Sequence, residues 1–130
     1  MAAIKSYKDL IVWQKAMDLV VEIYKLTDRF PKCEIYGLTS QMRRASVSIP
    51  SNIAEGRKLS SRKEFIRFLT IAYGSGTELE TQIEIAKRLN YLSPDDSLIA
   101  DQILNEVMRM LNKILSNNPL IQCCSNNQNF

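Results

Sequence analysis

Seven cationic and two acidic side chains fall between residues 43 and 67, so this segment carries a net charge of +5, against +3 for all 130 residues. Guanidinium and ammonium groups bind phosphate oxygens through charge-assisted hydrogen bonds, the usual chemistry of sequence-independent nucleic-acid contacts. We therefore predict a basic surface that binds RNA or DNA, although an acidic protein partner or plain solvation of exposed turns would fit the same charges. The residues expected to contact phosphate are Arg43, Arg44, Arg57, Lys58, Arg62, Lys63 and Arg67.

A second polar group, Ser48, Asn52 and Glu55, surrounds Pro50. Asn52 and Glu55 are three residues apart and would share one helix face. As a cryptic enzyme site, this group would give an activity that disappears in Glu55→Ala while the fold survives. The interpretation we adopt is structural, with hydrogen bonds that fix the chain around the proline or a subunit contact.

Other groups that could support catalysis or bind a metal are weak. The chain has no histidine, and it shows no nucleophile elbow or zinc-ligand spacing. The glycines at 74 and 76 follow no strand and precede no GK[ST], so they do not form a phosphate loop. Glu80 and Glu84 could hold a metal, but Lys87 and Arg88 lie within helical reach as ion-pair partners. We predict a non-enzymatic protein with no catalytic residue, no metal and no cofactor.

The composition indicates one all-α domain. The chain is 45% hydrophobic and 24% charged, with only four glycines and four prolines, and its length allows a self-sufficient core. No apolar run approaches the roughly 18 residues of a membrane span, and no signal-peptide core is present, so we predict a cytoplasmic protein. Cys33, Cys123 and Cys124 are expected to be free thiols.

Apolar residues recur three and four positions apart in four segments, which predicts helices over about 8–30, 34–55, 61–91 and 94–116. Short connections favour an antiparallel up-down-up-down four-helix bundle over residues 1–116. The remaining tail, 117–130, is polar and is expected to be disordered or to lie on a partner. The core stripe of the first helix is predicted to be Leu10, Trp13, Met17, Val20, Tyr24 and Thr27.

Two further stripes follow the same periodicity. The second helix would bury Leu38, Met42, Ala45, Ile49 and Ile53, and the third Phe65, Leu69, Ala72, Gly76, Leu79, Ile83 and Ala86. The first three helices carry more apolar residues than one buried stripe requires. Apolar surface of that extent usually marks subunit contacts, so we predict a homo-oligomer.

Pro50 interrupts the second apolar stripe, and the kink we expect there involves Ser46, Pro50, Asn52, Glu55 and Gly56. Proline has no N–H, so the Ser46 carbonyl loses its helical partner. Hydroxyls at Ser46, Ser48 and Ser51 could bond back to nearby carbonyls. The alternative is a helix that ends at Ile49 and a new one that begins at Pro50. Gly56 is expected to stop the helix in a left-handed conformation.

Two motifs in order, QMRRASVSIPSNIAEG and EFIRFLTIAYGSGTELETQIEIAKRLNYL, resemble the four-helix-bundle family named for proteins encoded in intervening sequences of bacterial 23S ribosomal RNA genes. The resemblance covers about residues 7–115 and implies a closed ring of five protomers. The resemblance also implies the fold of the accessory protein of diversity-generating retroelements, which assists a reverse transcriptase. In the family, the position of Gly76 is more often a large aliphatic residue, so a looser core is expected there.

Two non-enzymatic functions follow from these observations. The first is an oligomer that binds nucleic acid non-specifically through the basic segment. The second, implied by the resemblance, is an assembly scaffold that docks a protein such as a reverse transcriptase. A steep salt dependence of nucleic-acid binding would favour the first, and a neighbouring gene for that enzyme would favour the second.

Overall fold

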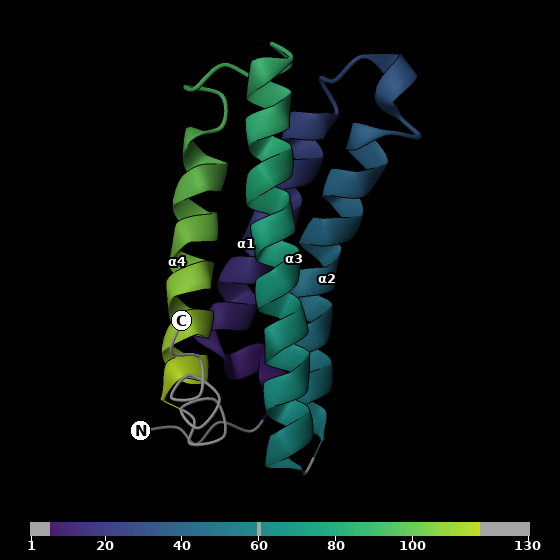
Figure 1. Cartoon of the computed structure of the whole chain (residues 1–130). Coiled ribbons are helices and arrows are strands. Elements are labelled where there is room, and N and C mark those ends of the chain that lie inside the picture. Colours follow the sequence, from purple (N-terminus) through teal and green to yellow (C-terminus); the bar gives the residue numbers. More distant parts are fainter. Residues whose placement is uncertain (1–5, 60, 118–130) are drawn as a thin grey trace, which may run out of the picture.

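The computed structural model describes residues 6–59 and 61–117, and this part of the chain contains helices and turns but no strand. The elements are η1 (Tyr7–Asp9), α1 (Ile11–Thr27), η2 (Lys32–Glu34), α2 (Leu38–Lys58), α3 (Arg62–Arg88) and α4 (Leu98–Ser116). The four long helices lie side by side, and successive helices run in opposite directions (Figure 1). The predicted all-α fold is confirmed, and each predicted helix end lies within four residues of the observed one.

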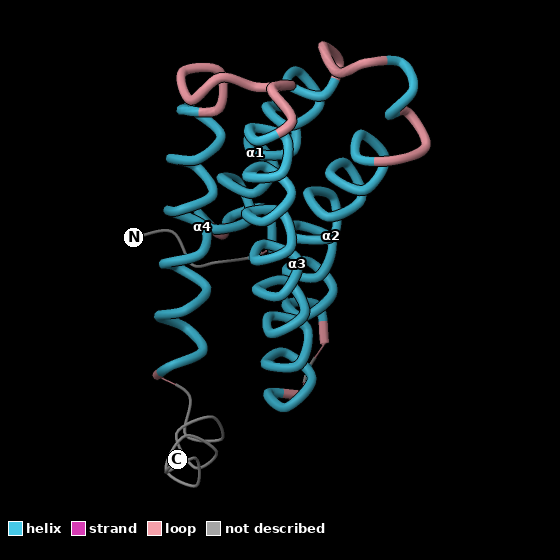
Figure 2. The backbone as a smooth tube through the Cα atoms, turned by 45° about the horizontal axis from the view of Figure 1, so that its top comes forward, coloured by secondary structure: helices cyan, strands magenta, loops and turns pink. Residues whose placement is uncertain are grey.

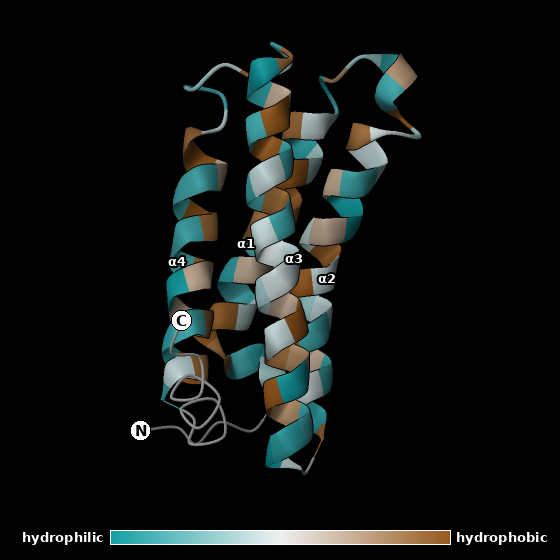
Figure 3. Cartoon of the chain, in the orientation of Figure 1, coloured by the Kyte–Doolittle hydropathy of each residue, from teal (hydrophilic) through white to brown (hydrophobic). Residues whose placement is uncertain are grey.

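Each helix contacts two others. α2 and α3 share the most extensive contact, and α1 packs on α2 and α4 while α3 also packs on α4. The α1–α2 and α3–α4 connections lie at one end of the bundle and the α2–α3 connection at the other (Figure 2). Hydrophobic residues recur along the whole length of every helix (Figure 3). One core therefore runs from end to end of the bundle.

The core stripes of α2 and α3 were predicted correctly, whereas that of α1 was wrong in part. α2 buries all five predicted residues, and α3 buries its stripe except Phe65, which is half-buried against the core. In α1, Met17 is 40% and Tyr24 is 42% exposed. Of the predicted residues, Thr27 is buried, and Leu10 and Trp13 are partly buried against the core. The other residues of α1 that face the core are Val12, Ala16, Leu19, Ile23 and Leu26.

The error in α1 has a physical cause. Two apolar stripes on α1 have the same alternation of three and four residues, and periodicity alone does not tell which of them meets α2 and α4. The stripe with smaller residues, such as Ala16, is fully buried. Met17 and Tyr24, which belong to the other stripe, lie on the outer surface.

α2 runs without interruption through Pro50, so the single-helix interpretation is confirmed and the break at Ile49 is wrong. The hydroxyl of Ser46 donates to the carbonyl of Arg43 at 2.8 Å, and that of Ser51 donates to Val47 at 2.8 Å, as predicted. Ser48 behaves differently, because its Oγ lies 2.8 Å from the Oγ of Ser75 on α3. The bend of the helix axis stays a prediction.

Gly56 does not end α2, which continues to Lys58, and no described glycine has a positive φ. Gly56 is buried where α2 meets α3. A Cβ atom built on it would lie 3.0 Å from the Cβ of Phe68 and 3.3 Å from the carbonyl oxygen of Phe65. The glycine is therefore required for close approach of two helix backbones and not for a turn.

Gly56→Ala is expected to lower the free energy of unfolding by about 1–3 kcal/mol, because neither the Phe68 Cβ nor a backbone oxygen can move away cheaply. Gly74→Ala is the matched control, since a Cβ at Gly74 would meet nothing within 4 Å. That variant should gain up to about 1 kcal/mol from helix propensity. Urea unfolding at one protein concentration measures both. Equal stabilisation by the two substitutions would contradict the close approach at Gly56.

Local hydrogen bonds explain why the start of α2 and the end of α3 differ from the predicted bounds. The carboxylate of Glu34 accepts a hydrogen bond from the N–H of Leu38 at 2.8 Å, so it caps α2 from outside the helix. At the end of α3, Asn90 takes the left-handed conformation with φ 62°. The N–H of Tyr91 then donates to Ala86 and that of Asn90 to Lys87, the hydrogen-bond pattern of a Schellman stop.

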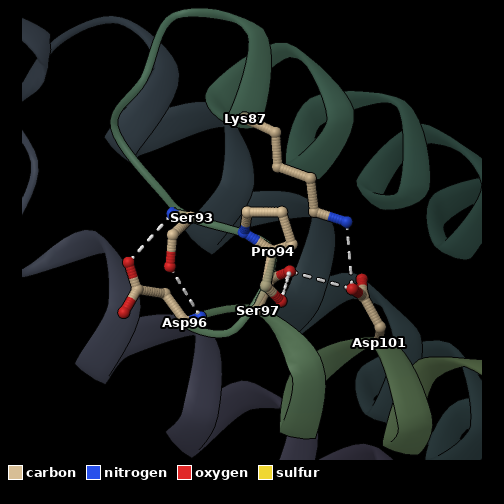
Figure 4. A network of polar contacts seen from close by, with 6 residues as sticks. All are labelled: Lys87, Ser93, Pro94, Asp96, Ser97 and Asp101. Carbon is tan, nitrogen blue, oxygen red and sulfur yellow. Dashed lines mark hydrogen bonds and ion pairs between the residues drawn. The ribbon is translucent and has the colours of Figure 1, made fainter.

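The start of α4 was predicted at Ser93 and Pro94, but the helix begins directly after Ser97. Ser93 and Asp96 still exchange reciprocal hydrogen bonds of 2.9 and 3.1 Å, which close a turn before the helix (Figure 4). The hydrogen bond that the backbone N–H of Ser93 donates to the carboxylate is the main cause of the lowered pKa of the Asp96 carboxyl. The buried hydroxyl of Ser97 donates to Asp101 at 2.9 Å, and Lys87 of α3 donates to the same carboxylate at 3.0 Å (Figure 4). The network ties α3 to α4.

The glycines within α3 have different environments. Gly76 is buried, and a Cβ built on it would overlap the sulfur of Met108 on α4. The thioether of Met108 thus occupies the space that a side chain at Gly76 would fill. The expected loosening of the core at Gly76 is therefore countered by a flexible side chain from the facing helix.

Candidate nucleic-acid interface

The turn between α2 and α3 places cations from two helices at one end of the bundle. Arg57 and Lys58 form the last turn of α2, and Arg62 and Lys63 open α3. All four side chains are exposed, and the described residues provide none of them with an ion pair. Cations in the last turn of α2 also interact favourably with the negative end of its dipole. We call these four residues, together with Arg67, the basic end.

Arg67 is the one member of the basic end with a carboxylate partner. Its Nη2 lies 2.7 Å from Oε2 of Glu64, and its guanidinium lies over the ring of Phe68 at 4.5 Å. The hydrogen bond from Arg67 lowers the pKa of the Glu64 carboxyl, and the same bond raises the pKa of Arg67, helped by Glu55. Ser61 accepts from the N–H of Glu64 at 3.4 Å and so caps the start of α3, while the Glu64 carboxylate pairs with Arg67.

Arg43 is held within the chain. Its Nε donates to the hydroxyl of Thr27 at 2.9 Å, its Nη2 lies 4.0 Å from the carboxylate of Asp28, and its guanidinium lies 4.6 Å from the ring centroid of Tyr24. All three partners belong to the end of α1. The side chain is half-buried, so it serves first to join α1 to α2.

Arg44 is exposed and lies about 20 Å along α2 from Arg57, at 1.5 Å per residue. It borders a shallow pocket of about 520 Å³ whose walls include Tyr24, Ile35 and Val47. The structure therefore separates the seven predicted phosphate contacts into two groups. Five lie at the basic end, while Arg43 and Arg44 lie toward the other end of α2.

The polar group near Pro50 comes together only in part. Asn52 Nδ2 donates to the carbonyl of Ser48 at 2.8 Å and to its Oγ at 3.0 Å, and Ser48 in turn contacts Ser75. Glu55 is exposed and takes no part in these bonds. Ser48 and Asn52 thus link α2 to itself and to α3, which agrees with the structural interpretation.

Among residues 6–59 and 61–117, no three cysteine, aspartate or glutamate side chains come together in a way that could hold a metal ion. None of the described helices is both long and apolar enough to span a membrane. Cys33 is an exposed free cysteine. Cys123, Cys124 and the tail predicted over 118–130 lie outside the described residues.

The outer face of α1 is a second surface of interest, and two of its residues, Met17 and Tyr24, were predicted to lie in the core. Ile11 is 62% exposed, Met17 40%, Val21 54% and Tyr24 42%. Trp13 is half-buried and packs edge-on against Tyr7, with 5.4 Å between ring centroids. We call this surface the outer α1 stripe. The sequence signal for this surface is the excess of apolar residues on the helix over one buried stripe.

The fold and the surface together define an all-α helical-bundle protein with a cationic end. The chain belongs to the family of 23S rRNA-intervening sequence proteins, whose model matches residues 8–113. The predicted resemblance is thereby confirmed. No curated protein matches the chain.

The chain is also similar to a solved structure. That crystal structure is of a protein with unknown function from the S23 ribosomal protein family of Bacteroides thetaiotaomicron VPI-5482. The two share 26% sequence identity with a TM-score of 0.73, and the match covers 81% of this chain and 98% of that one. The helical bundle is thus shared over nearly all of the neighbour.

Proposed function

We propose that this protein is a non-enzymatic, oligomeric helical-bundle protein of the cytoplasm that binds RNA or DNA through its basic end. The observation that carries the proposal is the set of four exposed cations at the α2–α3 turn, free of ion pairs with described residues. Unpaired cations keep their full attraction for phosphate, and they release condensed counterions from the nucleic acid on binding. Contacts of this kind fix the position of a ligand without reading its sequence.

Assembly would multiply this surface. The outer α1 stripe exposes large apolar side chains on one helix face, as subunit interfaces do. A contact between unlike faces of neighbouring protomers closes into a ring when the rotation allows. We propose a ring of five because the family resemblance implies that number. Each protomer would then add one basic end, and weak sites that act together bind with much higher avidity.

The proposal is tested by light scattering for the mass, followed by titration of the purified oligomer with labelled RNA and duplex DNA at two salt concentrations. Four phosphate contacts from one protomer should give a slope of log K against log salt of about −3 to −4. Binding that does not respond to salt would contradict the proposal. An oligomer that binds neither nucleic acid would favour a scaffold that docks a protein such as a reverse transcriptase.

A further inference from the structure

Next to the cations of the basic end lies a pocket of about 330 Å³ between the end of α2 and the start of α3. Its lining includes a phenylalanine, an exposed leucine and two arginines. The lining residues are Gly56, Arg57, Leu59, Ser61, Arg62 and Phe65.

The walls of the pocket are held in place by the bundle. Phe65 is half-buried against the core and lines the pocket as well. Gly56 lets α3 approach α2 so closely that a Cβ would lie 3.6 Å from a ring carbon of Phe65. Leu59 remains 43% exposed beside them. The aromatic ring is therefore fixed before any ligand binds.

Exposed cations line and flank this pocket. Arg57 and Arg62 enter its lining from different helices, and neither has an ion pair among the described residues. Lys58 and Lys63 are their exposed chain neighbours. An apolar, aromatic pocket surrounded by cations suits a flat, apolar-faced group attached to a negatively charged backbone. An unpaired nucleotide has both parts.

We propose that this pocket binds one unpaired base of a single-stranded RNA or DNA while the surrounding cations contact the flanking phosphates. Aromatic rings and guanidinium planes stack on bases of any type, so the pocket would select unpaired over paired nucleotides without reading sequence. Bases within a duplex are already stacked and do not reach such a pocket. The inference rests on the proposed nucleic-acid binding and adds the class of ligand.

The test compares three labelled probes by fluorescence anisotropy at one salt concentration: a single-stranded oligonucleotide, the matching duplex, and the same single strand with abasic sites. The abasic strand keeps its phosphates but lacks bases. We expect the oligomer to bind the intact strand about five-fold or more tighter than the abasic strand, because each stacked base contributes at least that much.

A substitution separates the pocket from the rest of the surface. Phe65→Leu keeps an apolar side chain against the core but removes the aromatic ring, so it should weaken single-strand binding about five-fold or more and leave duplex binding unchanged. Tyr73→Leu is the control, because Tyr73 is also half-buried on α3 and packs on the core but does not line the pocket. It should bind as the wild type does.

The two levels of the proposal fail in different ways. Equal affinity for intact and abasic strands, with a steep salt dependence, would overturn the base pocket and leave the basic end as a phosphate-binding surface. No binding to any probe would overturn both. The abasic comparison uses the wild-type protein, so it remains decisive if Phe65→Leu proves unstable.

Discussion

Arg57→Ala/Lys58→Ala/Arg62→Ala is expected to weaken nucleic-acid binding by about 100-fold at low salt. None of the three exposed cations has an ion pair among the described residues. Each substitution therefore removes a phosphate contact of about 1 kcal/mol. The slope of log K against log salt should also fall by about 2–3, because three fewer counterions are released. Anisotropy titrations of wild type and variant over a series of salt concentrations measure both quantities.

A control variant distinguishes binding through the basic end from attraction by the overall net charge. Lys25→Ala/Lys32→Ala/Arg109→Ala also removes three positive charges, but from exposed positions outside the basic end. Its binding should fall far less, and light scattering should show that both variants keep the wild-type mass. Equal losses in the two variants would mean that the protein attracts nucleic acid through its overall charge and not through the α2–α3 turn.

Met108→Ala is expected to lower the free energy of unfolding by about 2–5 kcal/mol, the range for truncation of a large buried side chain. Met108 is 8% exposed, and its sulfur fills the space left by Gly76. Truncation therefore leaves a cavity that the residues at positions 76 and 108 no longer fill. Urea unfolding at a fixed protein concentration measures the loss, because the stability of an oligomer depends on concentration.

A double-mutant cycle measures the interaction between positions 76 and 108. In the wild type, Gly76→Ala forces Met108 out of its position, which offsets the helix propensity that alanine gains. In the Met108→Ala background the methyl group enters an empty space, so the same substitution should be clearly stabilising. The two effects should differ by more than about 0.5 kcal/mol, as expected for residues in contact. An identical effect in both backgrounds would show that Met108 does not occupy the space at Gly76.

The sequence predicted the helices and two of the three core stripes correctly, because α2 and α3 each carry one dominant apolar face. It predicted the core face of α1 only in part, because that helix has two apolar stripes of equal period. The role of Gly56 was also missed. A glycine near the end of a helix suggests a stop, and only the packing against Phe68 shows that its small size is what matters.

The candidate site was partly predictable for a similar reason. Arg57, Lys58, Arg62 and Lys63 had to lie together, because a short connection joins the two helices that carry them. The engagement of Arg43 was not predictable, since its partners on α1 are at least 15 residues away in sequence and meet it only through helix packing. Doubled periodicity and charge partners between helices are therefore the points at which the sequence alone is insufficient.

The unequal lengths of the connections bear on how the bundle folds. Three residues join α2 to α3, whereas ten join α1 to α2 and nine join α3 to α4. A shorter loop loses less entropy on closure, and the α2–α3 pair also makes the most extensive contact of the bundle. Topology therefore favours the α2–α3 hairpin as the earliest helix pair along the folding route. That hairpin carries the basic end, so the surface proposed to meet nucleic acid would be assembled before α1 and α4 dock.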